Sequence, residues 1–255
     1  MRLDHLELHQ QHERTNWWWI ARQRIILQVL EPHVRRRALQ KGGAPERPLR
    51  LLDIGCGGGG FLEALSKYGQ AMGVDAEPTT VEFARRTTGC EVCLGVLPDD
   101  IRLPHGSFDV VCALDVIEHV ADDEAALRTI VDLLAPGGIF VCAVPAFGFL
   151  WSHHDVVNEH KRRYTRPELV SKIAAAGLTL ERATYFNIIL FPLIAAARML
   201  RSKRNETDGA DSPLVPRPVN AALTALFGSE RFLLRAFDAP FGVSLLTLAR
   251  KPEAA

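Results

Sequence analysis

A glycine-rich turn between a short apolar run and a helical segment constrains this chain more than any other feature. Residues 50–54 have the composition of a buried strand, and Gly55, Gly57 and Gly60 follow directly. Glycines let such a turn adopt positive φ angles and let a ligand contact bare backbone. Because the helix that follows begins with unpaired N–H groups, it attracts an anionic group. The turn therefore predicts a nucleotide-type ligand, although the same spacing also fits dinucleotide-binding proteins.

Apolar runs and helical stretches alternate along the chain after residue 50. The strands are expected at 50–54, 71–74, 90–96, 108–114, 138–144, 178–185 and 243–249, and the helices at 61–68, 78–86, 122–134 and 167–176. Strands that alternate with helices at this spacing predict a parallel sheet covered on both faces. A chain of 255 residues, 47% of them hydrophobic, is long enough to bury the core of one such α/β domain.

Two segments interrupt this alternation. Residues 1–48 are expected to form an N-terminal helical lid, and residues 49–255 the main domain with a helical insertion at 186–240. Trp17-Trp18-Trp19 could roof a ligand cleft or simply pack against the domain. Within the insertion, residues 186–200 are very apolar, 201–218 form a polar loop rich in proline, and 220–237 have the pattern of an amphipathic helix.

Charge and cysteine content exclude some classes of protein. The 30 basic and 30 acidic residues give zero formal net charge, which argues against coating nucleic acid through bulk charge. Five cysteines are an odd number and do not indicate a disulfide framework. Cys90 and Cys93 have metal or redox spacing, but no second pair accompanies them. Since the chain is polar from Met1 to Asn16, we expect no secretory signal and a cytoplasmic protein.

Two acidic residues narrow the choice of ligand. Asp75 ends the second expected strand, twenty residues after Gly55. Its carboxylate could accept hydrogen bonds from both ribose hydroxyls of a nucleoside, each worth roughly 1.5–3 kcal/mol. Asp53 lies two residues before the first glycine, where a carboxylate suits a positively charged methionine group better than a pyrophosphate.

Five motifs together resemble one enzyme superfamily. They are Leu51-Leu-Asp-Ile-Gly-Cys-Gly-Gly-Gly59, Gly73-Val-Asp75, Ser107-Phe-Asp-Val-Val111, Asp115-Val-Ile-Glu-His119 and Ala135-Pro-Gly-Gly138. Their order resembles class I S-adenosylmethionine-dependent methyltransferases, and within them the ubiquinone-biosynthesis O-methyltransferase branch and its bacterial relatives. The resemblance implies a Rossmann-like α/β fold whose seven-stranded, mostly parallel sheet has an antiparallel last strand. It also implies S-adenosyl-L-methionine as the cofactor.

The resemblance assigns a set of cofactor contacts. It implies Asp53, Gly55, Cys56 and Gly57 around the methionine end, Asp75 and Ala76 at the ribose, Leu97 near adenine, Leu114 beside the cofactor, and Arg22 at the methionine carboxylate. Related ubiquinone-pathway enzymes use an arginine from the upstream helix for that carboxylate, and Arg24 is a rival for the role.

The reacting end is expected at Asp115, Glu118 and His119. Their spacing would place them on one face of a helical turn. A phenol or alcohol acceptor must lose its proton to a base or a metal. Related enzymes use Glu/Glu/His at these positions for a divalent cation, which would be Mg²⁺ here, with aspartate as the first ligand. Three roles stay open: a metal site, His119 as a direct base, and a purely structural turn.

A polar loop after the fifth expected strand supplies candidate substrate contacts. Ligands of open α/β sheets lie beyond the carboxyl ends of the strands, where this loop begins. The candidates are His154, Asp155, His160, Arg163 and Tyr164. The alternative is a solvated basic loop that caps the next helix.

The sequence thus predicts a methyltransferase that acts on oxygen in a small-molecule or lipid-linked acceptor. The alternatives are an NAD-binding or nucleotide-binding protein without methyl transfer, and an RNA methyltransferase. Apolar residues 186–200 followed by basic residues up to 204 fit a helix in a membrane interface. They predict peripheral contact with the inner face of the membrane, against the alternative of a helical lid packed on the domain.

Overall fold

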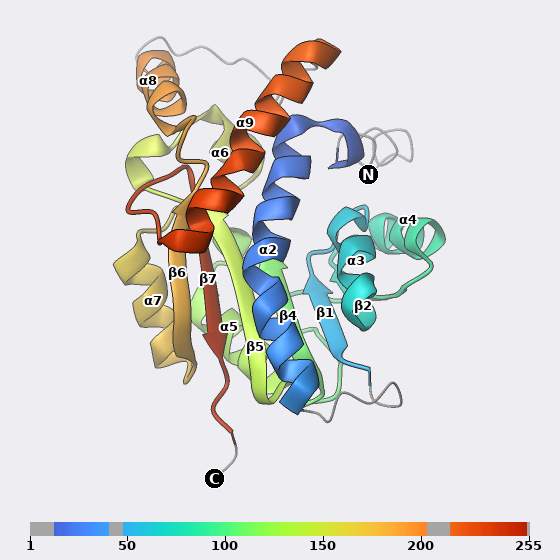
Figure 1. Ribbon diagram of the computed structural model, residues 1–255. Helices are drawn as coiled ribbons and strands as arrows, with labels where there is room; N and C mark the ends of the chain where they lie inside the picture. The colour runs from blue at the N-terminus through green and yellow to red at the C-terminus, as the bar shows by residue number, and fades with distance from the viewer. Residues whose placement is uncertain (1–12, 41–47, 203–214, 254–255) are drawn as a thin grey trace.

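A seven-stranded sheet forms the centre of the molecule, and the computed structural model describes residues 13–40, 48–202 and 215–253 (Figure 1). The strands are β1 (Arg50–Ile54), β2 (Gln70–Asp75), β3 (Glu91–Leu94), β4 (Phe108–Leu114), β5 (Leu134–Pro145), β6 (Thr179–Phe186) and β7 (Ser244–Arg250). Their order across the sheet is β3-β2-β1-β4-β5-β7-β6, and β7 alone of these strands runs antiparallel to its neighbours. The predicted Rossmann-like sheet with an antiparallel last strand is confirmed.

Helices cover both faces of this sheet. They are α2 (Trp17–Gln40), α3 (Gly60–Leu65), α4 (Pro78–Thr88), α5 (Asp123–Leu133), α6 (His153–Val157), α7 (Arg166–Ala175), α8 (Phe191–Ser202) and α9 (Arg217–Ala236). Short 3₁₀ turns are η1 (Ser66–Tyr68), η2 (Ile117–His119) and η3 (Gly148–Leu150). In Figure 1, α2 crosses the front of the sheet and α5 lies behind it. The central strands β4 and β5 are buried almost throughout, as expected for a parallel sheet covered on both sides.

Helix α2 is tied to the sheet at one end and to the insertion at the other. The Nε of Arg37 lies 3.1 Å from Oδ1 of Asp109, and both side chains are buried. At the opposite end, the backbone N–H of Trp17 donates to Asn220 Oδ1 over 2.8 Å. The Trp17 ring also packs edge-on against Phe227 of α9, with centroids 6.0 Å apart. Helices α2 and α9 therefore pack against each other, and Figure 1 shows them side by side.

The insertion consists of a packed helix and a more exposed one. Glu230 of α9 is fully buried, and its Oε1 accepts hydrogen bonds from the backbone N–H groups of Ile188 and Ile189. This contact fixes the turn before α8. Helix α8 itself leaves Leu193 and Met199 largely exposed. Among the described helices, none is both long and apolar enough to cross a membrane.

Candidate active site

The turn between β1 and α3 has the geometry that its glycines predict. Gly55 and Gly57 have φ angles of 70° and 53°. A Cβ added to Gly55 would lie 2.4 Å from Cγ2 of Val116, in the segment after β4. A larger residue at position 55 would therefore strain the backbone and collide with the neighbouring loop. The turn brings the ends of β1 and β4 together at the carboxyl edge of the sheet.

A cavity of about 590 Å³ opens at this edge. Seven residues predicted as site residues line it: Arg22, Asp53, Gly55, Cys56, Gly57, Leu114 and Asp115. Three predicted cofactor contacts, Asp75, Ala76 and Leu97, are not among its lining residues. A smaller cavity of about 250 Å³ lies beside the ends of β2 and β3, between Val74, Leu94 and residues 100–103. The residues predicted to surround the methionine end of the cofactor therefore all line the larger cavity.

Asp53 is a buried acid in this wall. Its side chain belongs to β1 and is 2% exposed. Burial raises the pKa of Asp53 to about 8, and the negative charge of Glu13 adds to the shift while Arg22 opposes it. The carboxyl group would ionise far more readily beside a cation. The position therefore suits a positively charged ligand.

Arg22 enters the same cavity from α2. Its side chain is 5% exposed, and its guanidinium lies over the rings of Trp18 and Trp19. Nη2 forms an ion pair of 2.7 Å with Oδ2 of Asp115, without the alignment of a hydrogen bond. Nε has no hydrogen-bond partner among the described residues. A buried, unsatisfied donor in a cavity wall fits a ligand carboxylate.

Asp75 supports the glycine turn from the end of β2. Its Oδ2 accepts from the backbone N–H of Gly57 over 3.0 Å, and its Oδ1 accepts from Glu77 over 3.1 Å. A carboxylate has four lone-pair sites, so two remain for a ligand. Asp75 is therefore positioned to receive ribose hydroxyls while it holds the turn.

The segment after β4 departs from the predicted helical face. Only Ile117–His119 forms a 3₁₀ turn, and Asp115 precedes it with a φ angle of 58°. Asp115 pairs with Arg22, whereas the side chain of Glu118 is fully buried. Burial raises the pKa of Glu118 well above its ordinary value, and the charge of Asp115 adds to this effect.

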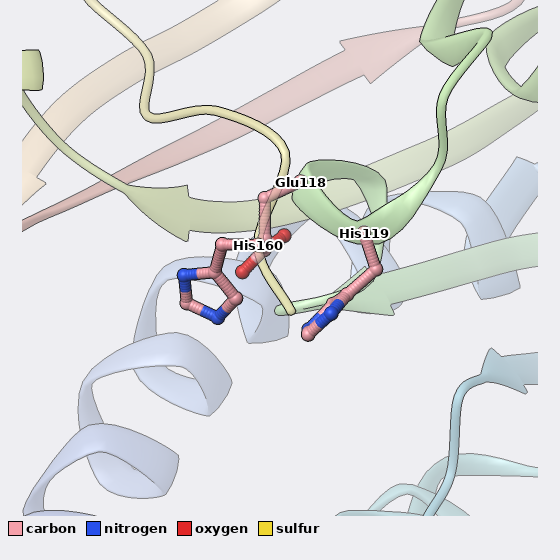
Figure 2. A group of neighbouring side chains, drawn as sticks. All are labelled: Glu118, His119 and His160. Carbon is pink, nitrogen blue, oxygen red and sulfur yellow. The ribbon is translucent and has the colours of Figure 1, made fainter. Parts of the chain in front are cut away.

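His160 completes a three-residue cluster with Glu118 and His119. One ligand atom from each lies within 4.8 Å of those of the other two. Figure 2 shows the Glu118 carboxylate beside the His160 ring, with His119 facing them from the same turn as Glu118. The two imidazole rings meet edge to face, with centroids 4.7 Å apart. Partial burial and the nearby His160 lower the pKa of His119, which favours the neutral ring.

The loop predicted to contact substrate is held together from within. Asp155 is fully buried and accepts from His160 Nδ1 over 2.9 Å and from Arg163 Nε over 2.7 Å. Burial alone would raise the pKa of Asp155, but these hydrogen bonds hold it well below its usual range. Tyr164 is buried and donates its hydroxyl to Asp123 over 2.7 Å. His154 packs edge-on against His160. Substrate contact by these five residues stays a prediction.

Sequence reasoning missed several residues that reach the cavity from the amino-terminal segment. Glu13 Oε2 accepts from the backbone N–H of Gly60 over 3.2 Å, at the start of α3. Gln23 donates to the Gly60 carbonyl over 3.0 Å and also lines the cavity, as does Arg24, which the sequence analysis names as the rival of Arg22. No motif marks Glu13 or Gln23. The sequence predicts helical structure in this segment, but it does not reveal which side chains meet the glycine turn.

Comparisons with known proteins agree with this geometry. A family model described as "Methyltransferase domain" matches residues 52–142. The ubiquinone biosynthesis O-methyltransferase of Caulobacter sp. (strain K31) is 36% identical over 143 residues, which span 49% of this chain and 57% of that protein. The enzyme of the same name from Xanthomonas axonopodis pv. citri (strain 306) is 31% identical over 190 residues, or 66% of this chain and 77% of that protein. This chain thus spans little more than half of the first relative and about three quarters of the second.

A solved structure supports the fold independently. The S-adenosylmethionine-dependent methyltransferase from Mesorhizobium loti superposes with a TM-score of 0.53 at 20% identity, covering 83% of this chain and 95% of that one. The family model and the two relatives confirm the resemblance drawn from the five sequence motifs, and the solved structure agrees with the fold.

Proposed function

Because this chain belongs to the methyltransferase family whose members include the ubiquinone biosynthesis O-methyltransferases, we propose that it methylates an oxygen of a small or lipid-linked acceptor with S-adenosyl-L-methionine. The observation that carries the proposal is the shared cavity wall of the β1 glycine turn, Asp53 and Arg22. It offers a buried acid, a buried cation and bare backbone to one ligand. The methionine end of the cofactor carries the matching charges: a sulfonium, an ammonium and a carboxylate.

Different residues would bind different parts of the cofactor. Arg22 has an unsatisfied Nε for the carboxylate, and Asp53 faces the positive charges. Asp75 has lone pairs left for the ribose, and Leu114 lines the cavity at the end of β4. When bound, S-adenosylmethionine supplies an electrophilic methyl group on a sulfonium. The protein contributes alignment, which is worth roughly 7–11 kcal/mol when the two reacting atoms are held in line.

The cluster of Glu118, His119 and His160 is proposed as the reacting end. Glu118 and His119 follow Leu114 and Asp115, which line the cofactor cavity, by only a few residues, and His160 joins them from the loop after β5. An acceptor hydroxyl that meets the cluster would come close to the methyl donor. Methylation there requires that the hydroxyl lose its proton, so a group that binds or accepts that proton belongs at this place.

A Mg²⁺ ion on Asp115, Glu118 and His119 stays a prediction that the contacts support only partly. Mg²⁺ prefers oxygen ligands. Of the two carboxylates, Asp115 is already engaged by Arg22, and the cluster that contains Glu118 and His119 adds an imidazole.

A lipid-linked acceptor and contact with a membrane surface are proposed from the exposed apolar residues around α8. Leu193 and Met199 lie on α8, and Phe149 of η3 packs against Phe191 at its start. This surface, formed by Phe149, Leu193 and Met199, is called the α8 surface below. Arg198 lies on the same helix and donates to the Leu150 carbonyl. Of the other basic residues of the prediction, Arg201 lies on α8, and Lys203 and Arg204 fall outside the described residues.

Calorimetric titration of the purified protein tests the cofactor proposal. We expect S-adenosylmethionine and S-adenosylhomocysteine to bind with one site per chain, and NAD to give no saturable heat. Methyl-labelled cofactor with an ortho-dihydroxybenzene, a phenolic acid and a single-stranded RNA then tests the reaction. Label in the hydroxyl compounds supports the proposal. Binding of NAD alone, or label in the RNA alone, would overturn it.

A further inference from the structure

The carboxyl group of Glu118 is buried without a hydrogen bond from any described side chain. Its side chain is 0% exposed, and neither oxygen has a hydrogen-bond partner among the described residues. Leaving a buried acceptor unsatisfied costs about 1–3 kcal/mol, and more if it is charged. His119 and His160 each offer a ring nitrogen within 4.8 Å of a Glu118 oxygen (Figure 2), and the charges of Asp115, Arg22 and Arg163 also act on this carboxyl group. The three groups offer one carboxylate oxygen and two imidazole nitrogens, which a cation could bind together.

Both histidines are oriented from outside the cluster. His160 uses Nδ1 to contact Asp155 at 2.9 Å, which leaves Nε2 for another partner. Asp155 is itself fixed by two hydrogen bonds from Arg163, of 2.7 and 3.0 Å. The backbone of Asn158 is a hydrogen-bond partner of His119. Metal-binding histidines typically donate their second N–H to a carboxylate or a backbone carbonyl, which fixes the tautomer and the ring.

Asp115 does not belong to this donor set. Its backbone adopts a φ angle of 58°, and its carboxylate pairs with Arg22 at 2.7 Å. The expected oxygen-rich ligand set of Asp115, Glu118 and His119 is therefore replaced in space by one carboxylate and two imidazoles. Imidazole suits first-row transition metals such as Zn²⁺, whereas Mg²⁺ and Ca²⁺ favour carboxylates, carbonyls and water.

We propose that Glu118, His119 and His160 bind one first-row transition-metal dication, with Zn²⁺ as the representative, in preference to Mg²⁺. Three protein ligands leave a fourth position open, as in catalytic zinc sites. The role of that position rests on the proposed function: it would bind the acceptor oxygen as its anion beside the methyl donor. Metal binding itself needs neither cofactor nor acceptor, so it can fail or succeed independently of methyl transfer.

Metal titration of the tag-free protein, first dialysed against a chelator, tests the site. Every protein in this titration carries Cys90→Ser and Cys93→Ser, because thiolates at CxxC spacing would compete for Zn²⁺. We expect calorimetry to show one Zn²⁺ per chain, unaffected by millimolar Mg²⁺. Co²⁺ in its place should give visible absorption without sulfur charge-transfer bands. We expect His160→Gln and Glu118→Gln to weaken Zn²⁺ binding at least tenfold, and Asp155→Asn to weaken it 10-fold to 100-fold through loss of histidine orientation.

Two variants serve as matched controls. His153→Ala removes an exposed histidine of the same loop, and Asp115→Asn removes the carboxylate that the sequence predicts as a ligand. His153→Ala should bind Zn²⁺ as the parent protein does. Asp115→Asn should lose less affinity than His160→Gln, because Asp115 supplies no ligand atom, and circular dichroism checks that every variant is folded. The proposal is overturned if no stoichiometric Zn²⁺ binds, if Mg²⁺ displaces it, or if Asp115→Asn loses the metal while His160→Gln keeps it.

Discussion

The guanidinium of Arg22 and the carboxylate of Asp115 lie 2.7 Å apart, on the boundary between the cofactor cavity and the reacting cluster. Arg22 comes from the amino-terminal helix, whereas Asp115 follows β4, so this ion pair joins distant parts of the chain. Asp115 pairs with Arg22, and His160 is the third member of the cluster that contains Glu118 and His119. The ion pair also fixes the arginine whose Nε faces the proposed cofactor.

We expect Arg22→Gln to weaken binding of S-adenosylmethionine at least tenfold, or about 1.4 kcal/mol. The reason is the loss of a buried cation opposite the ligand carboxylate. Arg24→Gln is the matched control, because Arg24 lies two residues further along α2 and also lines the cavity. Calorimetry should show a much smaller change for it. A larger loss in Arg24→Gln than in Arg22→Gln would assign the carboxylate contact to Arg24 instead.

Asp75→Ala should also weaken cofactor binding at least tenfold while the fold persists. The variant loses the proposed ribose acceptor and the hydrogen bond from Gly57 that supports the turn. Glu82→Ala, an exposed carboxylate on α4, controls for loss of negative charge. Affinity and thermal unfolding should be measured on the same preparations. Unchanged affinity in Asp75→Ala would count against the whole cofactor assignment.

Cofactor binding should strengthen as the pH rises toward 8. The pKa of Asp53 in the protein is raised to about 8, so the carboxyl is mostly protonated at pH 6. A cationic ligand favours the ionised form and must expel that proton, at a cost of up to tenfold in affinity per pH unit. We expect the dissociation constant to fall between pH 6 and 7.5, below the range of about 7.7–8.0 in which α-amino groups titrate.

Asp53→Asn provides the comparison for this pH dependence. The variant cannot ionise at position 53, so its affinity should be weaker and nearly flat over the same interval. Proton release measured in buffers of different ionisation enthalpy gives a second readout. Equal pH profiles for the parent protein and Asp53→Asn would show that another group titrates.

The local parts of this site were predictable from sequence, and the assembled parts were not. The strand, the glycine turn and the helix follow one another in the chain, so the sequence of residues 50–65 alone predicts how this segment folds. The contacts of Arg22 with Asp115 and of Glu13 with Gly60 join segments that only the tertiary fold brings together. Spacing also suggested one helical face for Asp115, Glu118 and His119. The left-handed backbone at Asp115 breaks that face, and residue order alone gives no sign of it.

The substrate loop shows the same limit. Histidine, arginine and aspartate on a loop predicted ligand contacts, but Asp155 and Arg163 satisfy one another in the interior. The sequence holds the right residue types for either outcome. Which outcome occurs depends on the turn at Ser152, whose capping box draws Asp155 inward.

Asp123→Asn should destabilise the fold by about 1–3 kcal/mol at pH 7, because Asp123 accepts from Tyr164 and Lys172 and pairs with Arg162. Burial opposes ionisation, but these partners lower the pKa of Asp123 below its ordinary value. The stabilisation is therefore present above the unfolded-state pKa of about 3.9. It disappears as the pH falls through the lower pKa of the folded state.

Urea unfolding at pH 7 and near pH 3 measures this difference. The gap between the parent protein and Asp123→Asn should shrink on acidification. Glu124→Gln is the matched control, since Glu124 also contacts Lys172 but is exposed. Its effect should be small at both pH values. A gap that grows in acid would contradict the assigned pKa direction.

Removal of exposed apolar side chains from the α8 surface should reduce binding to membranes. Leu193 is 70% exposed and Met199 57%, and neither contributes to the core. Burying such side chains in a lipid interface gains roughly 25 cal/mol per Å² of apolar surface. We expect the parent protein to float with anionic vesicles at low salt, and Leu193→Ser/Met199→Ser to remain largely in the unbound fraction. Leu39→Ser removes an equally exposed side chain, 76% accessible, near the end of α2 at the opposite end of the molecule in Figure 1. If the parent protein stays unbound, or Leu39→Ser loses binding as strongly as the α8 variant, the α8 surface is not the docking site.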